Sequence, residues 1–177
     1  GLYENDYDSI KSSYEKIKKS NNDIILDYGA EYMADYSILN NIEKRNLLTI
    51  NGEFVLLEFG FINIPENVFE IIFEIQHNGY KIILAHPERY RFFFKDFNKF
   101  DKLKKLGCYF QLNLLSVTGF YGNDIAKISD KLLGNNMIDF TGSDIHNNNQ
   151  LEKFYEKVRI KNIEKLKKAL KSNNKFG

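Results

Sequence analysis

The fold is decided by the stretch Lys81 to Tyr90, KIILAHPERY. Its apolar run, residues 82–85, predicts a buried strand that ends abruptly at His86. Pro87 fixes its own φ angle and biases the preceding residue away from helix, so the strand must end there. An imidazole, a carboxylate and a guanidinium therefore follow the strand within a few residues. They lie at the edge of a core, where catalytic groups are commonly placed.

Similar apolar runs occur on both sides of this strand. They begin at Phe54, Ile82, Tyr109 and Ile138, so successive runs start about 28 residues apart. The intervals contain amphipathic helical segments at 65–78, 97–106 and 124–133. Strand–helix alternation with apolar strands predicts a parallel sheet, and therefore a barrel or a doubly wound α/β fold. No glycine-rich phosphate-binding loop follows any of these runs, which argues against a nucleotide-binding fold.

The remaining segments complete the predicted order of elements. The pattern predicts helices at 8–20, 149–155 and 163–170, strands at 24–26, 108–112 and 137–140, and a segment at 35–46 that is either a short helix or irregular. A hairpin is predicted between the arms 47–50 and 54–57, because the Asn51-Gly52 pair accepts the positive φ angles of a type I′ turn.

The composition limits the class of protein. The 177 residues fit one domain with its own core, and a net charge of +1 gives no electrostatic reason to expect nucleic acid or an anionic membrane as a partner. Cys108 is the only cysteine, which excludes an internal disulfide and fits a reducing compartment. We find no signal peptide and no apolar run long enough to span a bilayer. A cytoplasmic location without membrane insertion is therefore expected.

Polar side chains stand at or just beyond the ends of the predicted strands. In chain order they are Glu31, Glu58, His86 with Arg89, Asn113, and Asp144 with His146. In a parallel barrel these ends meet at one face, which is the active-site face. Carboxylates and imidazoles together form a ligand set that suits zinc, manganese or iron, and does not suit calcium or an iron–sulfur cluster. Because the candidate ligands exceed what one tetrahedral ion takes, we expect two or more ions.

Arg89 adds a group that binds phosphate. A planar guanidinium clamps phosphate oxygens, while metal ions activate water and neutralise a phosphoryl group, so together they indicate phosphate ester hydrolysis. Each residue alone has a structural alternative: a surface or capping carboxylate for Glu31, Glu58 or Asp144, a hydrogen-bonded structural histidine for His86, and a pair with Glu88 on a solvated helix start for Arg89. Their coincidence at corresponding strand ends favours the chemical interpretation.

Several motifs resemble one known family along nearly the whole chain. They are Gly29-Ala30-Glu31, Leu56-Leu57-Glu58-Phe59, Leu84-Ala85-His86-Pro87-Glu88-Arg89-Tyr90, Gln111-Leu112-Asn113-Leu114-Leu115-Ser116, Asn135-Asn136-Met137-Ile138-Asp139 and Gly142-Ser143-Asp144-Ile145-His146-Asn147. Their combination and order resemble the bacterial polymerase and histidinol phosphatase (PHP) superfamily. More narrowly, they resemble its capsule-biosynthesis protein-tyrosine phosphatases.

The resemblance implies a distorted (β/α)₇ TIM-like barrel, formed as a single domain over residues 1–177. It implies a cluster of about three divalent metal ions, commonly manganese, with iron or zinc as alternatives. The implied activity is hydrolysis of phosphotyrosine on a bacterial tyrosine autokinase that controls capsular or exopolysaccharide synthesis and export. The implied metal ligands are Glu31, Glu58, His86, Asp144 and His146. Arg89 would hold the phosphate, with Asn113 and Glu88 supporting these groups.

The chain departs from the family pattern in two places. The family's opening His-x-His strand, a nearby Asp and a Thr-Pro-His are not found, and the match begins just after them. We therefore expect a barrel without its first one or two β/α units, from an incomplete sequence or a truncated form that binds metal poorly. The additional arginine that often follows Asp-x-His is also missing, so the phosphate clamp depends on Arg89 alone or on Lys153. Two alternatives stay open: a phosphoesterase for a small phosphomonoester, and a non-catalytic module that docks on a kinase.

Overall fold

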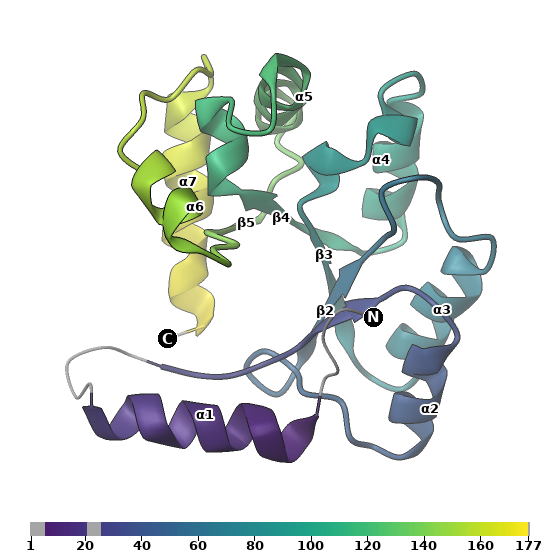
Figure 1. The fold of residues 1–177 in the computed structure, drawn as a ribbon. Coiled ribbons are helices and arrows are strands. Elements are labelled where there is room, and N and C mark those ends of the chain that lie inside the picture. The colour runs from purple at the N-terminus through teal and green to yellow at the C-terminus, as the bar shows by residue number, and fades with distance from the viewer. Residues whose placement is uncertain (1–5, 21–25, 177) are drawn as a thin grey trace.

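Five parallel strands form the sheet in the computed structural model, which describes residues 6–20 and 26–176 (Figure 1). The strands are β1 (Glu31–Met33), β2 (Phe54–Glu58), β3 (Lys81–Ala85), β4 (Tyr109–Asn113) and β5 (Phe140–Gly142). Their order in the sheet is their order in the chain, β1-β2-β3-β4-β5, and every neighbouring pair is parallel. The parallel α/β sheet predicted from the apolar runs is therefore confirmed.

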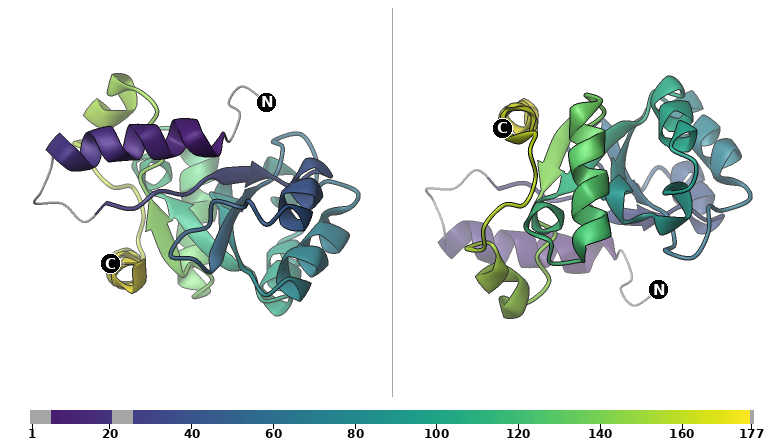
Figure 2. Two further views of the ribbon diagram at one scale, coloured as in Figure 1. Left: turned by 90° about the horizontal axis from the view of Figure 1, so that it is seen from below. Right: turned by 90° about the horizontal axis from the view of Figure 1, so that it is seen from above.

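Helices precede, separate and follow the strands. They are α1 (Tyr7–Ser20), α2 (Ser37–Glu43), α3 (Val68–His77), α4 (Asn98–Lys105), α5 (Asn123–Gly134), α6 (Asn148–Lys153) and α7 (Ile163–Ser172). Short 3₁₀ helices follow β3 and β4 and end the described chain: η1 (Pro87–Arg89), η2 (Arg91–Phe93), η3 (Leu114–Thr118) and η4 (Asn173–Phe176). Helices α2 to α5 lie around the outside of the curved sheet, and α1 lies on the opposite side of the molecule from α5 (Figures 1 and 2).

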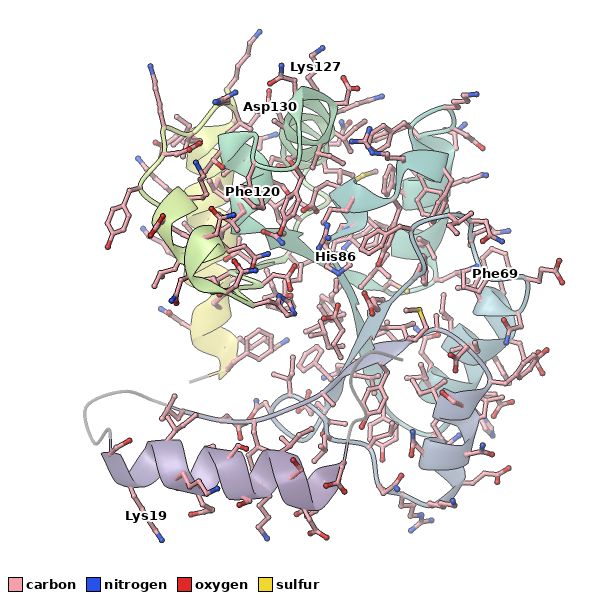
Figure 3. The ribbon with its side chains drawn as sticks, viewed as in Figure 1. Lys19, Phe69, His86, Phe120, Lys127 and Asp130 are labelled. Atoms are coloured by element: carbon pink, nitrogen blue, oxygen red, sulfur yellow. The ribbon has the colours of Figure 1, made fainter. Side chains whose placement is uncertain are left out.

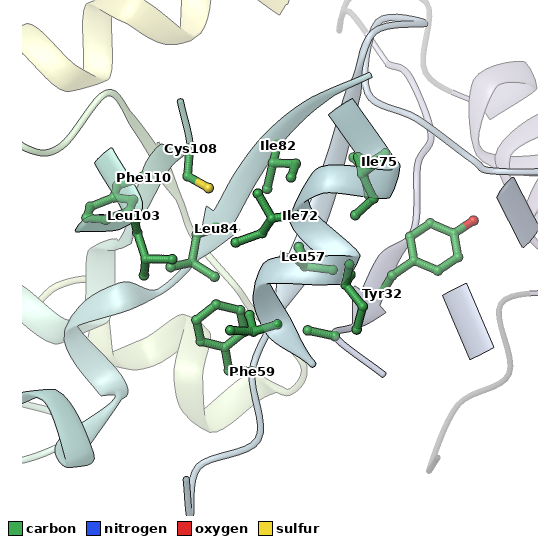
Figure 4. Packing of buried hydrophobic residues seen from close by; sticks show 14 of the residues in the cluster. Tyr32, Leu57, Phe59, Ile72, Ile75, Ile82, Leu84, Leu103, Cys108 and Phe110 are labelled. Carbon is green, nitrogen blue, oxygen red and sulfur yellow. The ribbon is translucent and has the colours of Figure 1, made fainter. Parts of the chain in front are cut away.

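The outer face of the sheet is covered mainly by α3 and α4. Successive strand residues point to opposite faces, so Val55 and Leu57 of β2 share this face with Ile82 and Leu84 of β3. The facing side of α3 carries apolar residues at helical spacing, namely Val68, Ile71, Ile72 and Ile75, and all are buried (Figure 4). Full burial of each isoleucine contributes about 1.5–3 kcal/mol to stability.

The inner face changes character along the strands. Near the start of the strands, Phe54, Ile83 and Phe140 form a second cluster, and Phe176 of η4 lies on it with its ring 4.7 Å from that of Phe140. Two or four residues further along, the same alternation brings Glu58, Gln111 and Asn113 onto this face. The inner face is therefore apolar at the amino ends of the strands and polar at their carboxyl ends.

Three strand predictions need correction. Of the strand predicted at 24–26, residues 24 and 25 lie outside the described residues and Leu26 has no regular structure; the first strand is Glu31–Met33.

The predicted hairpin forms only in part. Asn51 and Gly52 take the predicted positive φ angles, 51° and 71°, but only Ile50 and Phe54 pair across the turn. The two arms do not pair further because both edges of β2 are occupied by β1 and β3.

The strand predicted at 137–140 instead runs from Phe140 to Gly142. Met137 and Ile138 pack in the outer clusters before the chain enters the sheet, so their apolar character reflects burial without strand pairing. Within the described residues β1 and β5 are the two edge strands, and the seven-unit barrel stays a proposal. Those residues also contain no helix that is both long and apolar enough to cross a bilayer.

Candidate active site

His86 lies at the point where β3 gives way to η1. Its backbone is left-handed, with φ 35° and ψ 53°, and its amide donates a hydrogen bond of 2.8 Å to the carbonyl oxygen of Gln111. A left-handed conformation costs a residue with a side chain about 1–2 kcal/mol and is most often kept at functional sites. Only 5% of the His86 side chain is exposed, and Figure 3 places it near the centre of the molecule, far from the peripheral Phe69 and Lys127.

Two carboxylates face the buried imidazole. His86 Nε2 lies 3.2 Å from Glu31 Oε1 and 3.5 Å from Glu58 Oε2. Glu58 is the last residue of β2, as the sequence predicted. Glu31 was expected after a strand, but it begins β1 and pairs in register with Leu56, two residues before Glu58. Both glutamates lie on the inner face. Glu31 stands two residues nearer the start of the strands than Glu58, and its side chain still reaches His86.

The electrostatics of this group favour a positive charge at its centre. Burial lowers the pKa of His86, but the hydrogen bonds to Glu31 and Glu58 outweigh it and raise the pKa to about 9, with Arg89 opposing them. Two carboxylates that face each other repel unless a proton or a cation lies between them. One ligand atom from each of Glu31, Glu58 and His86 lies within 4.8 Å of the others. The three donors therefore fit a divalent transition metal in both geometry and chemistry.

Arg89 and Asp144 form the second part of the site. Arg89 Nη1 donates to Asp144 Oδ2 at 2.9 Å, and Asn113 Nδ2 donates to the same oxygen at 2.7 Å. Asp144 also lines a cavity of about 170 Å³. The other residues that line it are Glu31, Leu56, Ala85, His86, Gln111, Asn113 and Gly142. Asp144 thus shares a cavity with two of the three metal donors, while its carboxylate is held by Arg89.

His146 is set apart from the three-donor group. Its Nδ1 lies 2.9 Å from the backbone oxygen of Asp144 and 3.5 Å from Asp144 Oδ1, and 54% of its side chain is exposed. Among the described residues, Glu31, Glu58 and His86 are the group with metal-binding spacing, and neither Asp144 nor His146 belongs to it. Their roles as ligands, and the expectation of two or more ions, stay predictions.

Glu88 and Asn113 connect the elements that carry the site. The Asn113 side chain caps η3 by accepting from the Leu115 amide. Glu88 is fully buried, and its Oε1 accepts 2.6 Å and 3.1 Å hydrogen bonds from Ser116 Oγ and the Asn113 amide. Burial raises the pKa of Glu88, and the Ser116 hydrogen bond opposes this. The alternative that Arg89 pairs with Glu88 on a solvated helix start is therefore wrong.

Two aromatic residues at the site were not found from the sequence. The Arg89 guanidinium carbon lies 4.7 Å from the ring centroid of Phe61 and 4.4 Å from that of Tyr121. Phe61 follows β2 by three residues, and Tyr121 follows η3, so both lie in loops after the carboxyl ends of strands. That placement was the available signal, but aromatic residues are frequent in this chain and the pattern does not single these two out.

Comparison with known proteins gives one consistent result. Residues 2–175 match the model of a family described as capsular polysaccharide synthesis, CpsB/CapC. The chain is 28% identical over 152 residues to the tyrosine-protein phosphatase YwqE of Bacillus subtilis, and 25% identical over 157 residues to the tyrosine-protein phosphatase CpsB of Streptococcus pneumoniae. These matches cover 83% of this chain, and 60% and 65% of the relatives.

A solved structure agrees with the sequence relatives. It comes from work on YwqE and CpsB that describes them as metal-dependent tyrosine phosphatases. It superposes with a TM-score of 0.75 and 27% identity, covering 99% of this chain and 68% of that one. Together with CapC of Staphylococcus aureus, of which 68% is covered, the comparisons show that this chain spans roughly two thirds of the length of its relatives. Because the family model matches almost every residue, the chain belongs to the capsular polysaccharide synthesis CpsB/CapC family.

Proposed function

We propose that this chain carries the active site of a metal-dependent protein-tyrosine phosphatase. The observation that carries the proposal is that Glu31 and Glu58 converge on the buried His86. Arg89 lies in the 3₁₀ turn that directly follows His86. Relatives with this family's sequence are named tyrosine-protein phosphatases, which supports the same activity here. The substrate we propose is the phosphorylated tyrosine tail of a bacterial autokinase that controls capsular or exopolysaccharide synthesis and export.

The metal of the proposal is manganese, with iron and zinc as alternatives. Glu31, Glu58 and His86 would hold it, and Asp144 and His146 would join them on release of the contacts that now hold them. When bound, the ion supplies charge neutralisation for the phosphoryl group and lowers the pKa of a water molecule. In this scheme Arg89 binds phosphate oxygens, and Asn113 positions Asp144 through the 2.7 Å hydrogen bond.

The proposal extends to the architecture and the compartment. The curved parallel sheet, with helices outside and an inner face that is apolar at the amino ends of its strands, supports a distorted (β/α)₇ barrel formed as one domain. We place the reaction in the cytoplasm, where a single reduced cysteine such as Cys108 is ordinary. The protein partner that we propose is the tyrosine-containing tail of the kinase.

Turnover and metal content test the proposal together. The purified chain is assayed with added manganese on a phosphotyrosine tail peptide and on small phosphomonoesters such as histidinol phosphate, and its bound metals are measured by mass spectrometry. Manganese-stimulated release of phosphate from the peptide is expected. Turnover of the small esters alone would assign a different phosphoesterase activity. A chain with neither a bound transition metal nor manganese-stimulated turnover would be a non-catalytic module that docks on a kinase.

A further inference from the structure

The Arg89 guanidinium lies against two aromatic rings. Its central carbon lies 4.7 Å from the Phe61 centroid and 4.4 Å from the Tyr121 centroid. The Tyr121 hydroxyl is itself held, at 3.3 Å from Asn113 Nδ2 and 3.4 Å from Gln150 Nε2. Cation–π contact with two rings restrains the guanidinium and leaves N–H groups at its edge free to bind.

Only some of the N–H donors at the edge of the guanidinium take part in hydrogen bonds found among the described residues. Of its five N–H donors, the hydrogen bond found among the described residues goes from Nη1 to Asp144. A phosphate bound by the remaining donors would lie at the edge of the guanidinium. It would therefore be close to the rim of the Phe61 ring, which is also stacked on the His86 ring with centroids 5.7 Å apart.

An apolar rim continues from this point toward solvent. Phe61 is 49% exposed and its neighbour Ile62 is 90% exposed, in the loop between β2 and α3. Phe61 lies beside the Arg89 cation and the buried His86 imidazole, and Ile62 follows it in the chain; neither side chain belongs to a core cluster. Exposed apolar groups next to a polar site commonly contact a ligand.

We propose that Phe61 and Ile62 select aryl phosphates over alkyl phosphates, and that Phe61 and Tyr121 together position Arg89. In an aryl phosphate the ring is joined directly to the ester oxygen, so a phosphate at Arg89 brings the ring against Phe61. An alkyl phosphate reaches Arg89 but offers no ring to this rim. The inference rests on the proposed function, because it assigns the groups that recognise the phosphotyrosine ring.

Two phosphonates that cannot be hydrolysed as esters separate these roles. Phenylphosphonate and methylphosphonate share the anionic group and differ in the ring, and their dissociation constants are measured by calorimetry in the presence of manganese. Wild type is expected to prefer phenylphosphonate. Phe61→Leu and Ile62→Ser are each expected to reduce this preference, by about 3- to 10-fold for Phe61→Leu. Phe73→Leu is the matched control, because Phe73 is also exposed, at 60%, but stacks on His77 of α3.

Variants of Tyr121 test whether this ring positions Arg89 without selecting between the aryl and the alkyl ligand. Tyr121→Leu is expected to weaken both phosphonates by the same factor, and Tyr121→Phe to restore both, since the ring stacks on Arg89 whether or not it carries a hydroxyl. If the ring had a purely structural role, the variants would differ from the wild type in thermal stability, and both dissociation constants would keep their wild-type values.

The outcomes also separate this inference from the proposed function. An unchanged preference in both Phe61→Leu and Ile62→Ser, an equal change in Phe73→Leu, or a wild type that binds neither phosphonate would overturn the inference, even if phosphotyrosine peptide is hydrolysed. A lost preference in Phe61→Leu and Ile62→Ser, in a chain that hydrolyses no phosphotyrosine, would support the rim as an aryl phosphate site and reject the phosphatase proposal. Should Phe61→Leu fail to fold, the exposed Ile62→Ser variant carries the test.

Discussion

His86 combines backbone strain, burial and two facing carboxylates in one residue. Pro87 and the hydrogen bond from the His86 amide to the Gln111 carbonyl oxygen end β3, and the left-handed His86 lines the cavity. Arg89, three residues later, faces a different partner, Asp144. The two residues are thus close in sequence but belong to separate halves of the site, so their substitution should have separable effects.

Replacing His86 should affect metal binding, whereas replacing Arg89 should affect phosphate binding. We expect His86→Ala to weaken manganese binding by at least about 100-fold, because one donor of three is lost. Arg89→Ala should retain the metal and lower turnover of phosphotyrosine peptide by about 100- to 1000-fold. Metal content and turnover are measured on both variants.

His77→Ala is the control for the His86 variant, because His77 lies at the exposed end of α3 and contacts Phe73. It should change neither quantity. Equal loss of metal from His86→Ala and Arg89→Ala would contradict the division of roles.

The burial of Glu88 predicts that this residue makes a pH-dependent contribution to stability. Burial raises its pKa above the ordinary value of 4.5, so the folded protein holds this proton more tightly than the unfolded chain does. The stabilisation is present below pH 4.5 and is lost as the pH rises through the raised value. Relative to Glu88→Gln, which has no such proton, the free energy of unfolding of the wild type should therefore fall as the pH rises above 4.5.

Urea unfolding of the metal-free wild type and the Glu88→Gln variant from pH 4 to pH 8 measures this difference. Glu66→Gln serves as the control for the loss of one carboxylate, because Glu66 is exposed. A constant difference between wild type and Glu88→Gln would show that Glu88 has the same proton affinity in both states.

At the scale of elements, turns fix where the strands begin and end. The Asn51-Gly52 turn leads into β2, and the His86-Pro87 turn ends β3. Between them, alternation along β2 and β3 assigns each side chain to the outer or the inner face. A one-residue shift in β2 would move Glu58 from the inner face beside His86 to the face covered by α3, so these turns determine whether the site forms.

Gly52→Ala should lower stability by about 1 kcal/mol, because an alanine at φ 71° adopts a left-handed conformation that disfavours Cβ. Gly60→Ala is the matched control: an added Cβ meets no atom within 4 Å at either glycine, but only Gly52 has a positive φ. Gly60→Ala should therefore change stability by less than about 0.5 kcal/mol. Thermal unfolding of the two variants measures this, and equal effects would show that backbone conformation is not the cause.

The whole molecule is stabilised by the outer cluster between the sheet and its helices, and Cys108 lies within it (Figure 4). Its thiol is 2% exposed, and burial raises its pKa to about 12, with Lys104 opposing. The thiol is therefore both inaccessible and protonated at neutral pH. Its reaction with a disulfide reagent should require opening of the cluster, which makes this single cysteine a probe of global stability.

Leu103→Ala should lower stability by about 2–5 kcal/mol and accelerate thiol labelling of the native protein by about tenfold for each 1.4 kcal/mol lost. Leu103 is buried on α4 and belongs to the cluster that contains Cys108. Lys105→Ala, on the exposed side of the same helix, should leave the rate unchanged. Rapid labelling of the wild type at a rate insensitive to Leu103→Ala would show that the thiol is reached by a local motion.

The sequence by itself determined the features that act over short distances. Apolar periodicity identified the parallel α/β order and α3, the Asn51-Gly52 pair identified the turn, and Pro87 identified the end of β3, because backbone preferences and side-chain periodicity operate within a few residues. Glu58, His86 and Arg89 could be named as candidate site residues for the same reason, since each stands at or after the end of a recognisable strand.

Only the tertiary structure decided which of these groups meet. The pairing of Arg89 with Asp144 joins residues 55 positions apart, and the short strand that carries Glu31 is defined by its pairing with β2. The rings of Phe61 and Tyr121 reach Arg89 from two different loops. Such contacts depend on strand register and on packing between distant segments, and no local pattern in the chain encodes them.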